Sequence, residues 1–269
     1  MSTSRPASPA CWIGTSWKMT KTSAEARTYA HHLATSSTTV PEHIQMFVVP
    51  PFTVLAEVAT ILADSRVTIG AQNAHWAPQG AYTGEISVPM VADTGATLVE
   101  LGHSERRTHF AETDETVNRK VHAVLDAGLR PLVCVGEPWT ERQTNTATEY
   151  VLRQVKIALS GVSAAQAGRV LFAYEPIWAI GEQGQPASPQ QAEDMHARIR
   201  HALTDLYGAG GASIPVLYGG SVNPDNAGAL VAQDHIDGLF VGRSAWTVDG
   251  YLTIIRQATE ALGVDHGRK

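Results

Sequence analysis

The sequence predicts a single α/β domain that folds as an eight-stranded parallel (β/α)8 barrel. Short apolar runs that are typical of strands alternate with helical stretches eight times along the chain. The 269 residues and the hydrophobic content of 43% suit one barrel with a large core. A doubly wound parallel sheet is the alternative. It predicts a glycine-rich turn after the first strand, where this chain has Ser16-Trp17-Lys18.

Each predicted strand is a short apolar run that ends at a turn or at proline. Pro50-Pro51 follows the second run, Pro176 stops the sixth, and Gly219-Gly220 follows the seventh. The expected strands are 12–17, 44–49, 67–71, 97–101, 131–135, 170–174, 216–218 and 236–241.

The predicted helices lie between these strands and after the last one. Ala127-Gly128 is a stop signal for one helix, and Ser188-Pro189 supplies another with an N-cap residue and a proline at its first position. The expected helices are 23–35, 53–63, 88–94, 113–127, 139–160, 188–207, 226–233 and 245–262, with a further short helix that begins near Ser104. The aromatic-rich loop 72–85 is long and suits a protruding arm better than a tight turn.

Composition excludes several classes of function. Residues 1–11 are expected to form a disordered tail without the apolar segment of a signal peptide, and 12–269 to form the barrel domain. The net charge of -6 comes without long charge runs, so we expect no nucleic-acid partner and no membrane surface, and no stretch is long enough to span a membrane. Cys11 and Cys134 are far apart and lack zinc-type spacing, which favours reduced thiols in the cytoplasm and no metal. Small-molecule chemistry remains.

The stretch from Val170 to Gly181 has the pattern of a catalytic base followed by a covering loop. A strand-like run delivers Glu175 at its end, Pro176 stops the strand, and the apolar loop 177–181 follows. A carboxylate next to Trp178 and Ile180 becomes a stronger base when such a loop excludes water, as proton abstraction beside a carbonyl requires. A surface Glu that caps or pairs at the strand end is the alternative.

Other polar residues follow other strands, and in a parallel barrel these positions meet at one end. They are Ser16 and Lys18 after strand one, His103 after strand four, Ser221 after strand seven and Gly242-Arg243 after strand eight. His103 precedes a short helix whose N-terminus favours a neutral imidazole that donates a hydrogen bond. Bare backbone N–H groups at Gly219-Gly220-Ser221 and at Gly242 are the usual way in which this architecture holds a phosphate.

Together these segments resemble the triosephosphate isomerase family over about residues 12–262, which implies a TIM barrel. The matching motifs are Trp17-Lys18-Met19, the segments 101–107 and 173–181, and Tyr218-Gly-Gly-Ser-Val222. The resemblance implies that Glu175 abstracts a proton beside the substrate carbonyl and that neutral His103 relays protons between the oxygens of an enediolate. It also implies that Lys18 stabilises negative charge, and that the backbone at Gly181, Ser221 and Gly242 holds the phosphate. No cofactor is implied, and the loop 73–85 is expected to form a homodimer.

Three departures from the triose enzymes favour a branch of this family that acts on four-carbon ketose phosphates. Ser16 stands where the triose enzymes have Asn, the segment 181–188 that leaves the loop is altered, and Arg243 replaces the second glycine of a Gly-Gly pair. These features resemble the L-erythrulose-1-phosphate isomerase branch. They imply interconversion of L-erythrulose 1-phosphate, which has one more hydroxymethyl group than dihydroxyacetone phosphate, and D-erythrulose 4-phosphate.

Two alternatives stay open from the sequence. Neutral drift in a triosephosphate isomerase could produce the same departures, because a backbone N–H at Arg243 binds phosphate whatever its side chain. A non-catalytic binding protein of the family is the other alternative, but it would be expected to lack Lys18, His103 or Glu175, and all three are present.

Overall fold

The computed structural model describes residues 11–180 and 186–263. Within these residues, eight parallel strands follow one another around a closed barrel, and β8 pairs with β1. The strands are β1 (Cys11–Ser16), β2 (Ile44–Val49), β3 (Thr68–Ala71), β4 (Leu98–Leu101), β5 (Arg130–Val135), β6 (Leu171–Tyr174), β7 (Val216–Tyr218) and β8 (Gly238–Val241). The predicted fold class is confirmed.

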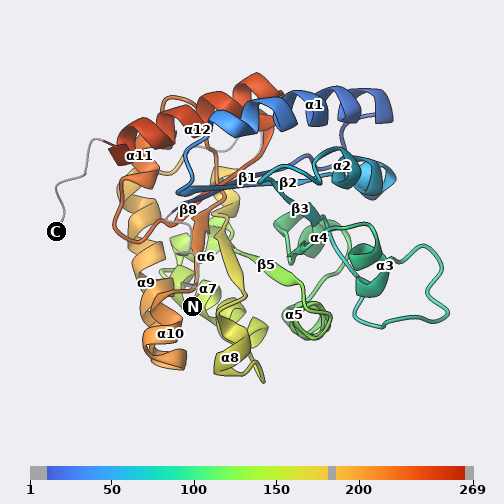
Figure 1. Cartoon of the computed structure of the whole chain (residues 1–269). Coiled ribbons are helices and arrows are strands. Elements are labelled where there is room, and N and C mark those ends of the chain that lie inside the picture. The colour runs from blue at the N-terminus through green and yellow to red at the C-terminus, as the bar shows by residue number, and fades with distance from the viewer. Residues whose placement is uncertain (1–10, 181–185, 264–269) are drawn as a thin grey trace, which may run out of the picture.

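Helices cover the outside of the barrel (Figure 1). They are α1 (Ser23–Ser36), α2 (Leu55–Ile61), α3 (Val88–Asp93), α4 (Ser104–His109), α5 (Asp114–Asp126), α6 (Trp139–Gln143), α7 (Ala147–Ala158), α8 (Ala164–Ala167), α9 (Pro189–Tyr207), α10 (Ala209–Ala212), α11 (Ala227–Val231) and α12 (Val248–Gly263). Short 3-10 turns also occur: η1 (Ser37–Thr39), η2 (Phe52–Val54), η3 (Ile177–Ala179) and η4 (Arg243–Ala245). In the described part of the chain, no helix is long and apolar enough to cross a membrane.

The barrel has two apolar layers. The inner layer consists of strand residues that alternate with outward-facing ones: Trp12, Phe47, Val49, Leu98, Leu132, Cys134, Leu171, Ala173, Leu217 and Phe240. A larger cluster packs the outer faces of the strands against the helices. Gly14 is required by the inner layer, since a Cβ at that position would lie 2.2 Å from the ring of Phe47.

Several elements differ from the sequence prediction. β1 begins at Cys11, one residue earlier than expected, so Cys11 is a buried strand residue and not part of a tail; residues 1–10 lie outside the described residues. The helix expected over 139–160 is two helices, α6 and α7, because the chain turns between them at Asn145, where φ is 59°. Asn tolerates this left-handed conformation better than most residues. The short helices α8 and α10 were not predicted.

The loop after β3 is the predicted arm. Figure 1 shows it in teal, projecting away from the barrel beyond α3. His75 lies at its base and is buried; it stacks on Trp76 at a centroid distance of 4.1 Å and contacts the tilted ring of Tyr82 at 4.2 Å. Residues 78–85 at the tip are exposed in the single chain.

Candidate active site

A cavity of about 350 Å³ opens at the C-terminal ends of the strands. The predicted residues Ser16, Lys18, His103, Glu175, Ser221, Gly242 and Arg243 all line it. They come from the ends of β1, β4, β6, β7 and β8, so the topology brings together residues that are more than 200 positions apart. The remaining predicted residue, Gly181, lies outside the described residues.

Glu175 follows β6 directly and is 3% exposed. Its backbone N–H donates to the carbonyl of Val135 at 2.7 Å, which fixes the backbone from which the side chain reaches the cavity. Gly219 lies against it, because a Cβ there would come within 2.9 Å of Glu175 Cγ. Oε2 is buried and has no hydrogen-bond partner among the described residues. A carboxylate oxygen with no such partner can accept a proton from a bound molecule.

His103 is the N-cap residue of α4, and its Nδ1 accepts a hydrogen bond from the backbone N–H of Glu105 at 3.1 Å. An imidazole nitrogen that accepts carries no proton, so the neutral ring carries its proton on Nε2. Nε2 lies 3.5 Å from Glu175 Oε1. The N-cap contact therefore turns Nε2 of His103 toward the carboxylate, where it can donate a hydrogen bond, and the proton-relay role of His103 stays a prediction.

Lys18 reaches the cavity from the loop after β1, where its backbone takes the unusual φ of 52°. Its Nζ donates to Glu105 Oε1 at 2.6 Å. Burial lowers the pKa of Lys18, but the hydrogen bond and charge of Glu105, with the charges of Glu175 and Glu100, offset this effect and raise the pKa above its ordinary value. Lys18 therefore brings a positive charge to the cavity at neutral pH.

The sequence prediction missed Glu100, a buried carboxylate on β4. Ser16 Oγ donates to Glu100 Oε2 at 2.9 Å. Burial raises the pKa of Glu100 to about 7, and the charge of Glu175 contributes in the same direction, whereas His103, Ser16 and Lys18 act against it. A single acidic residue within the apolar run 97–101 is the signal that could have revealed it.

Cys134 lies between the two carboxylates, and Glu100, Cys134 and Glu175 have ligand atoms within 4.8 Å of one another. Burial, together with the charges of Glu175 and Glu100, raises the pKa of the Cys134 thiol well above its ordinary range. A protonated thiol is a poor metal ligand, since metals bind the thiolate. The three residues therefore combine two carboxyl groups with a thiol that stays protonated at neutral pH.

The loop after Glu175 is described as far as Ile180. Of the two apolar side chains expected to cover the base, Ile180 lines the cavity, whereas the Trp178 indole N–H donates to Glu137 Oε1 at 2.9 Å. The Arg142 guanidinium packs over the Trp178 ring at 4.6 Å. Trp178 is thus not among the residues that line the cavity, and Glu175 is buried by other residues.

One side of the cavity is formed by the loops that follow the last two strands. Residues 219–222 after β7 and 242–244 after β8 line it, and the Asn226 amide holds the first loop by donating to the carbonyl of Ser221 at 2.9 Å. Arg243 begins η4, and its side chain is exposed. A carboxylate, an imidazole and an ammonium thus share a cavity with two glycine-containing loops, an arrangement that suits proton transfer beside the carbonyl of a small anion.

Comparison with known proteins identifies the family. Residues 11–258 match the family model described as triosephosphate isomerase. The crystal structure of triosephosphate isomerase from Bartonella henselae is 33% identical with a TM-score of 0.83, over 93% of this chain and 99% of that one. The chain belongs to the triosephosphate isomerase family.

Curated members of the triosephosphate isomerase family include closer relatives. L-erythrulose-1-phosphate isomerase of Rhizobium rhizogenes is 51% identical over 260 residues, which are 96% of this chain and 98% of the relative. The protein of the same name from Mesorhizobium japonicum is 51% identical over 93% of this chain and 98% of the relative. The one from Brucella abortus is 52% identical over 91% and 94%. The resemblance stated from the sequence motifs is confirmed, whereas the roles of single residues stay predictions.

Proposed function

We propose that this chain is a cofactor-independent ketose-phosphate isomerase that interconverts L-erythrulose 1-phosphate and D-erythrulose 4-phosphate. The observation that carries the proposal is the buried Glu175 carboxylate, which lies 3.5 Å from the Nε2 of His103 in a cavity that glycine-containing loops also line. Identity of about half the residues with proteins named L-erythrulose-1-phosphate isomerase, over nearly the whole chain, supports the four-carbon substrate.

The proposed reaction moves a carbonyl group by one carbon. Glu175 removes the proton from C3 of L-erythrulose 1-phosphate, beside the C2 carbonyl, and an enediolate forms. His103 transfers its Nε2 proton to the oxygen on C2. The deprotonated Nε2 then accepts the proton from the oxygen on C3. Glu175 then returns its proton to C2, which gives D-erythrulose 4-phosphate. Substrate and product are isomers, so the reaction needs no oxidant, reductant or further reactant. The charge of Lys18 stabilises the enediolate.

The phosphate group is proposed to bind where backbone N–H groups line the cavity, at Ser221 and Gly242, with Gly181 as a third contact outside the described residues. Arg243 adds positive charge at the same edge. Because phosphorylated sugars are made and used inside cells, we place the enzyme in the cytoplasm.

A second candidate is isomerisation of dihydroxyacetone phosphate and D-glyceraldehyde 3-phosphate. The match to a structure titled triosephosphate isomerase favours it. Its chemistry uses the same base, the same histidine and the same enediolate, so only the substrate differs. The four-carbon proposal is preferred because the more similar curated relatives bear the four-carbon name at 51% identity, against 33% for the triose structure.

The first prediction tests the base with Glu175→Gln, which keeps the shape of the side chain but removes its basicity. Turnover on L-erythrulose 1-phosphate should fall ~100-fold or more, because general base catalysis contributes ~100-fold to 10,000-fold. His103→Ala should also lower the rate, because the carbonyl is then no longer polarised.

Rates of the purified protein on both the four-carbon and the three-carbon phosphate decide the outcome. Glu260→Gln on the exposed face of α12 is the matched control and should leave both rates unchanged. Near-normal turnover of Glu175→Gln would reject the base. A wild-type protein that prefers the triose would reject the four-carbon assignment and leave the base intact.

We also propose that the protein forms a homodimer through the loop 73–85. Met19 and Phe110 are 96% and 65% exposed in loops after β1 and β4, and the exposed arm tip follows β3. β3 and β4 are adjacent in the barrel, and only β2 separates them from β1. All three loops leave the barrel at the same end, so one partner surface could cover all of them.

A further inference from the structure

Trp246, just after η4, connects the last strand–helix unit to the first. Its side chain lines the active-site cavity together with Ser16 and Lys18. The indole N–H donates to the backbone carbonyl of Ser16 at 3.1 Å. This hydrogen bond reaches the last residue of β1, at the point where the chain leaves the strand for the cavity.

Trp246 is itself held in place from the opposite side. Lys21 Nζ donates to the carbonyl of Trp246 at 2.5 Å, and the buried Tyr29 hydroxyl donates to the carbonyl of Ala245 at 3.0 Å. The same ammonium lies 5.1 Å from the ring centroids of Trp17 and Tyr29. The segment 245–246 is therefore a fixed support, so its indole can restrain Ser16.

Ser16 is restrained at both of its polar groups. Its hydroxyl donates to Glu100 Oε2 at 2.9 Å, and its carbonyl accepts from Trp246. Two residues later comes Lys18, whose positive φ leaves little freedom to absorb a shift in the strand end. A displacement of Ser16 would therefore move both the contact to Glu100 and the ammonium of Lys18.

We propose that Trp246 is a positioning residue, and that its hydrogen bond to Ser16 holds the pocket wall at the spacing that the four-carbon substrate needs. The substrate assignment in this inference rests on the proposed function. Trp246 lines the cavity, and its N–H holds the backbone carbonyl of Ser16, whose hydroxyl contacts Glu100. The space for the additional hydroxymethyl group then depends on Trp246, which takes no part in proton transfer.

Trp246→Phe tests the inference, because it keeps an aromatic ring and removes only the N–H and the second ring. We expect kcat/KM on L-erythrulose 1-phosphate to fall about 10-fold, mainly through kcat, since one lost hydrogen bond has an effect of this order. The fall on dihydroxyacetone phosphate should be smaller, about 3-fold, so that the ratio of the two constants moves toward the triose.

Tyr251→Phe is the matched control. The Tyr251 hydroxyl on α12 donates to the carbonyl of Ile13 at 2.6 Å, on the same strand but away from the cavity. Its loss should lower the melting temperature without changing the substrate ratio. If Trp246→Phe fails to fold, Lys21→Met, which frees the support but keeps the indole, should change the ratio in the same direction.

An unchanged ratio in Trp246→Phe, or an equal change in Tyr251→Phe, would overturn the inference and make Trp246 a purely structural residue. Wild-type turnover separates this failure from failure of the proposed function. A wild type that is inactive on L-erythrulose 1-phosphate rejects that function. A Trp246→Phe variant with the wild-type ratio, in a protein that is active on this substrate, rejects only the positioning role.

Discussion

Among single residues, Ser16 contributes to the cavity through both a hydrogen bond and its small size. Its hydroxyl hydrogen-bonds Glu100, and its small volume leaves room in the cavity. An Asn at this position could still donate an N–H to the carboxylate, because its amide nitrogen is a donor as well. The difference between Ser and Asn at position 16 is therefore mainly one of volume.

Ser16→Asn should for this reason lower turnover on L-erythrulose 1-phosphate, while turnover on D-glyceraldehyde 3-phosphate holds or rises. Overfilling a pocket costs ~1 to 3 kcal/mol, which corresponds to a swing of about tenfold or more between the two substrates. Steady-state rates of the wild type and the variant on both substrates measure it. Equal losses on both would instead show that Ser16 contacts the reacting oxygens without a part in substrate length.

The residues predicted from sequence are those whose position needs only the strand order. Glu175, His103 and Lys18 each follow a strand, so the barrel topology alone places them at one end. Glu100 and Trp246 were not predicted as site residues. Glu100 lies within an apolar strand, and Trp246 acts through a hydrogen bond to a residue 230 positions away, which no local pattern contains.

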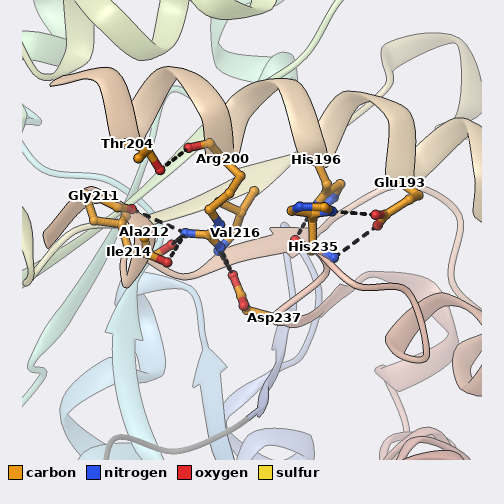
Figure 2. A network of polar contacts seen from close by, with 10 residues as sticks. All are labelled: Glu193, His196, Arg200, Thr204, Gly211, Ala212, Ile214, Val216, His235 and Asp237. Atoms are coloured by element: carbon orange, nitrogen blue, oxygen red, sulfur yellow. Dashed lines mark hydrogen bonds and ion pairs between the residues drawn. The ribbon is translucent and has the colours of Figure 1, made fainter. Parts of the chain in front are cut away.

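At the scale of elements, α9 is anchored to the segments around β7 and β8 by a row of polar side chains (Figure 2). Arg200 pairs with Asp237 and donates to the carbonyl of Ala212 at 2.9 Å, while Glu193 Oε1 lies 2.5 Å from His235 Nδ1. His196 is fully buried between them, with its Nδ1 3.2 Å from the carbonyl of His235. The predicted helix 188–207 is confirmed, but its pattern gave no sign of this anchoring.

His196 should make stability depend on pH. Burial, with contributions from the charges of Arg200 and His235, lowers its pKa from 6.5 to about 3. Between about pH 3 and pH 6.5, His196 therefore binds a proton in the unfolded chain but not in the folded protein. Stability from His196 is therefore fully present above pH 6.5 and is lost as pH falls from 6.5 toward 3, by at most about 1.4 kcal/mol per pH unit.

His196→Asn keeps an N–H donor near Nδ1 and cannot titrate. Urea unfolding of both proteins at pH 7, 6 and 5, at one protein concentration, should give a shallower pH slope for the variant. Carboxylates titrate in both proteins and cancel in the difference. Identical slopes would show that His196 is protonated as easily in the folded protein as in the unfolded chain.

The prediction of a single helix over 139–160 was wrong, because the structure has two helices there, α6 and α7. Residues 140–146 contain no apolar side chain, and Thr144 and Thr146 hydrogen-bond each other through their hydroxyls at 2.8 Å on either side of Asn145. Hydroxyl and amide side chains compete with helical backbone bonds in this way. The Thr-Asn-Thr triplet was the available signal, since Asn at a positive φ ends a helix.

At the scale of the whole molecule, closure of the barrel explains why the fold was easier to predict than the site. Every strand is paired on both sides, including β1 with β8, so the alternation of strands and helices leaves few other arrangements. The side chains inside the barrel can then be predicted, because alternate residues of each strand point to opposite faces of the sheet. What alternation does not determine is the loop geometry, including the direction of the arm after β3.

The last prediction concerns this arm. In the single chain, residues 78–85 are exposed, and Tyr82 is 47% exposed although its ring contacts His75. If the arm inserts into a second subunit, light scattering should give twice the mass of one chain at micromolar concentration. Deleting residues 78–84 should give a monomer with reduced turnover, because the arm begins next to Lys18, whose carbonyl accepts from Gln72 at 2.9 Å. Leu206→Ser removes an apolar side chain of similar exposure, 45%, on α9 and should leave both mass and turnover unchanged. A wild-type monomer would mean that the arm serves only its own barrel, and a deletion variant that remained dimeric would place the interface elsewhere.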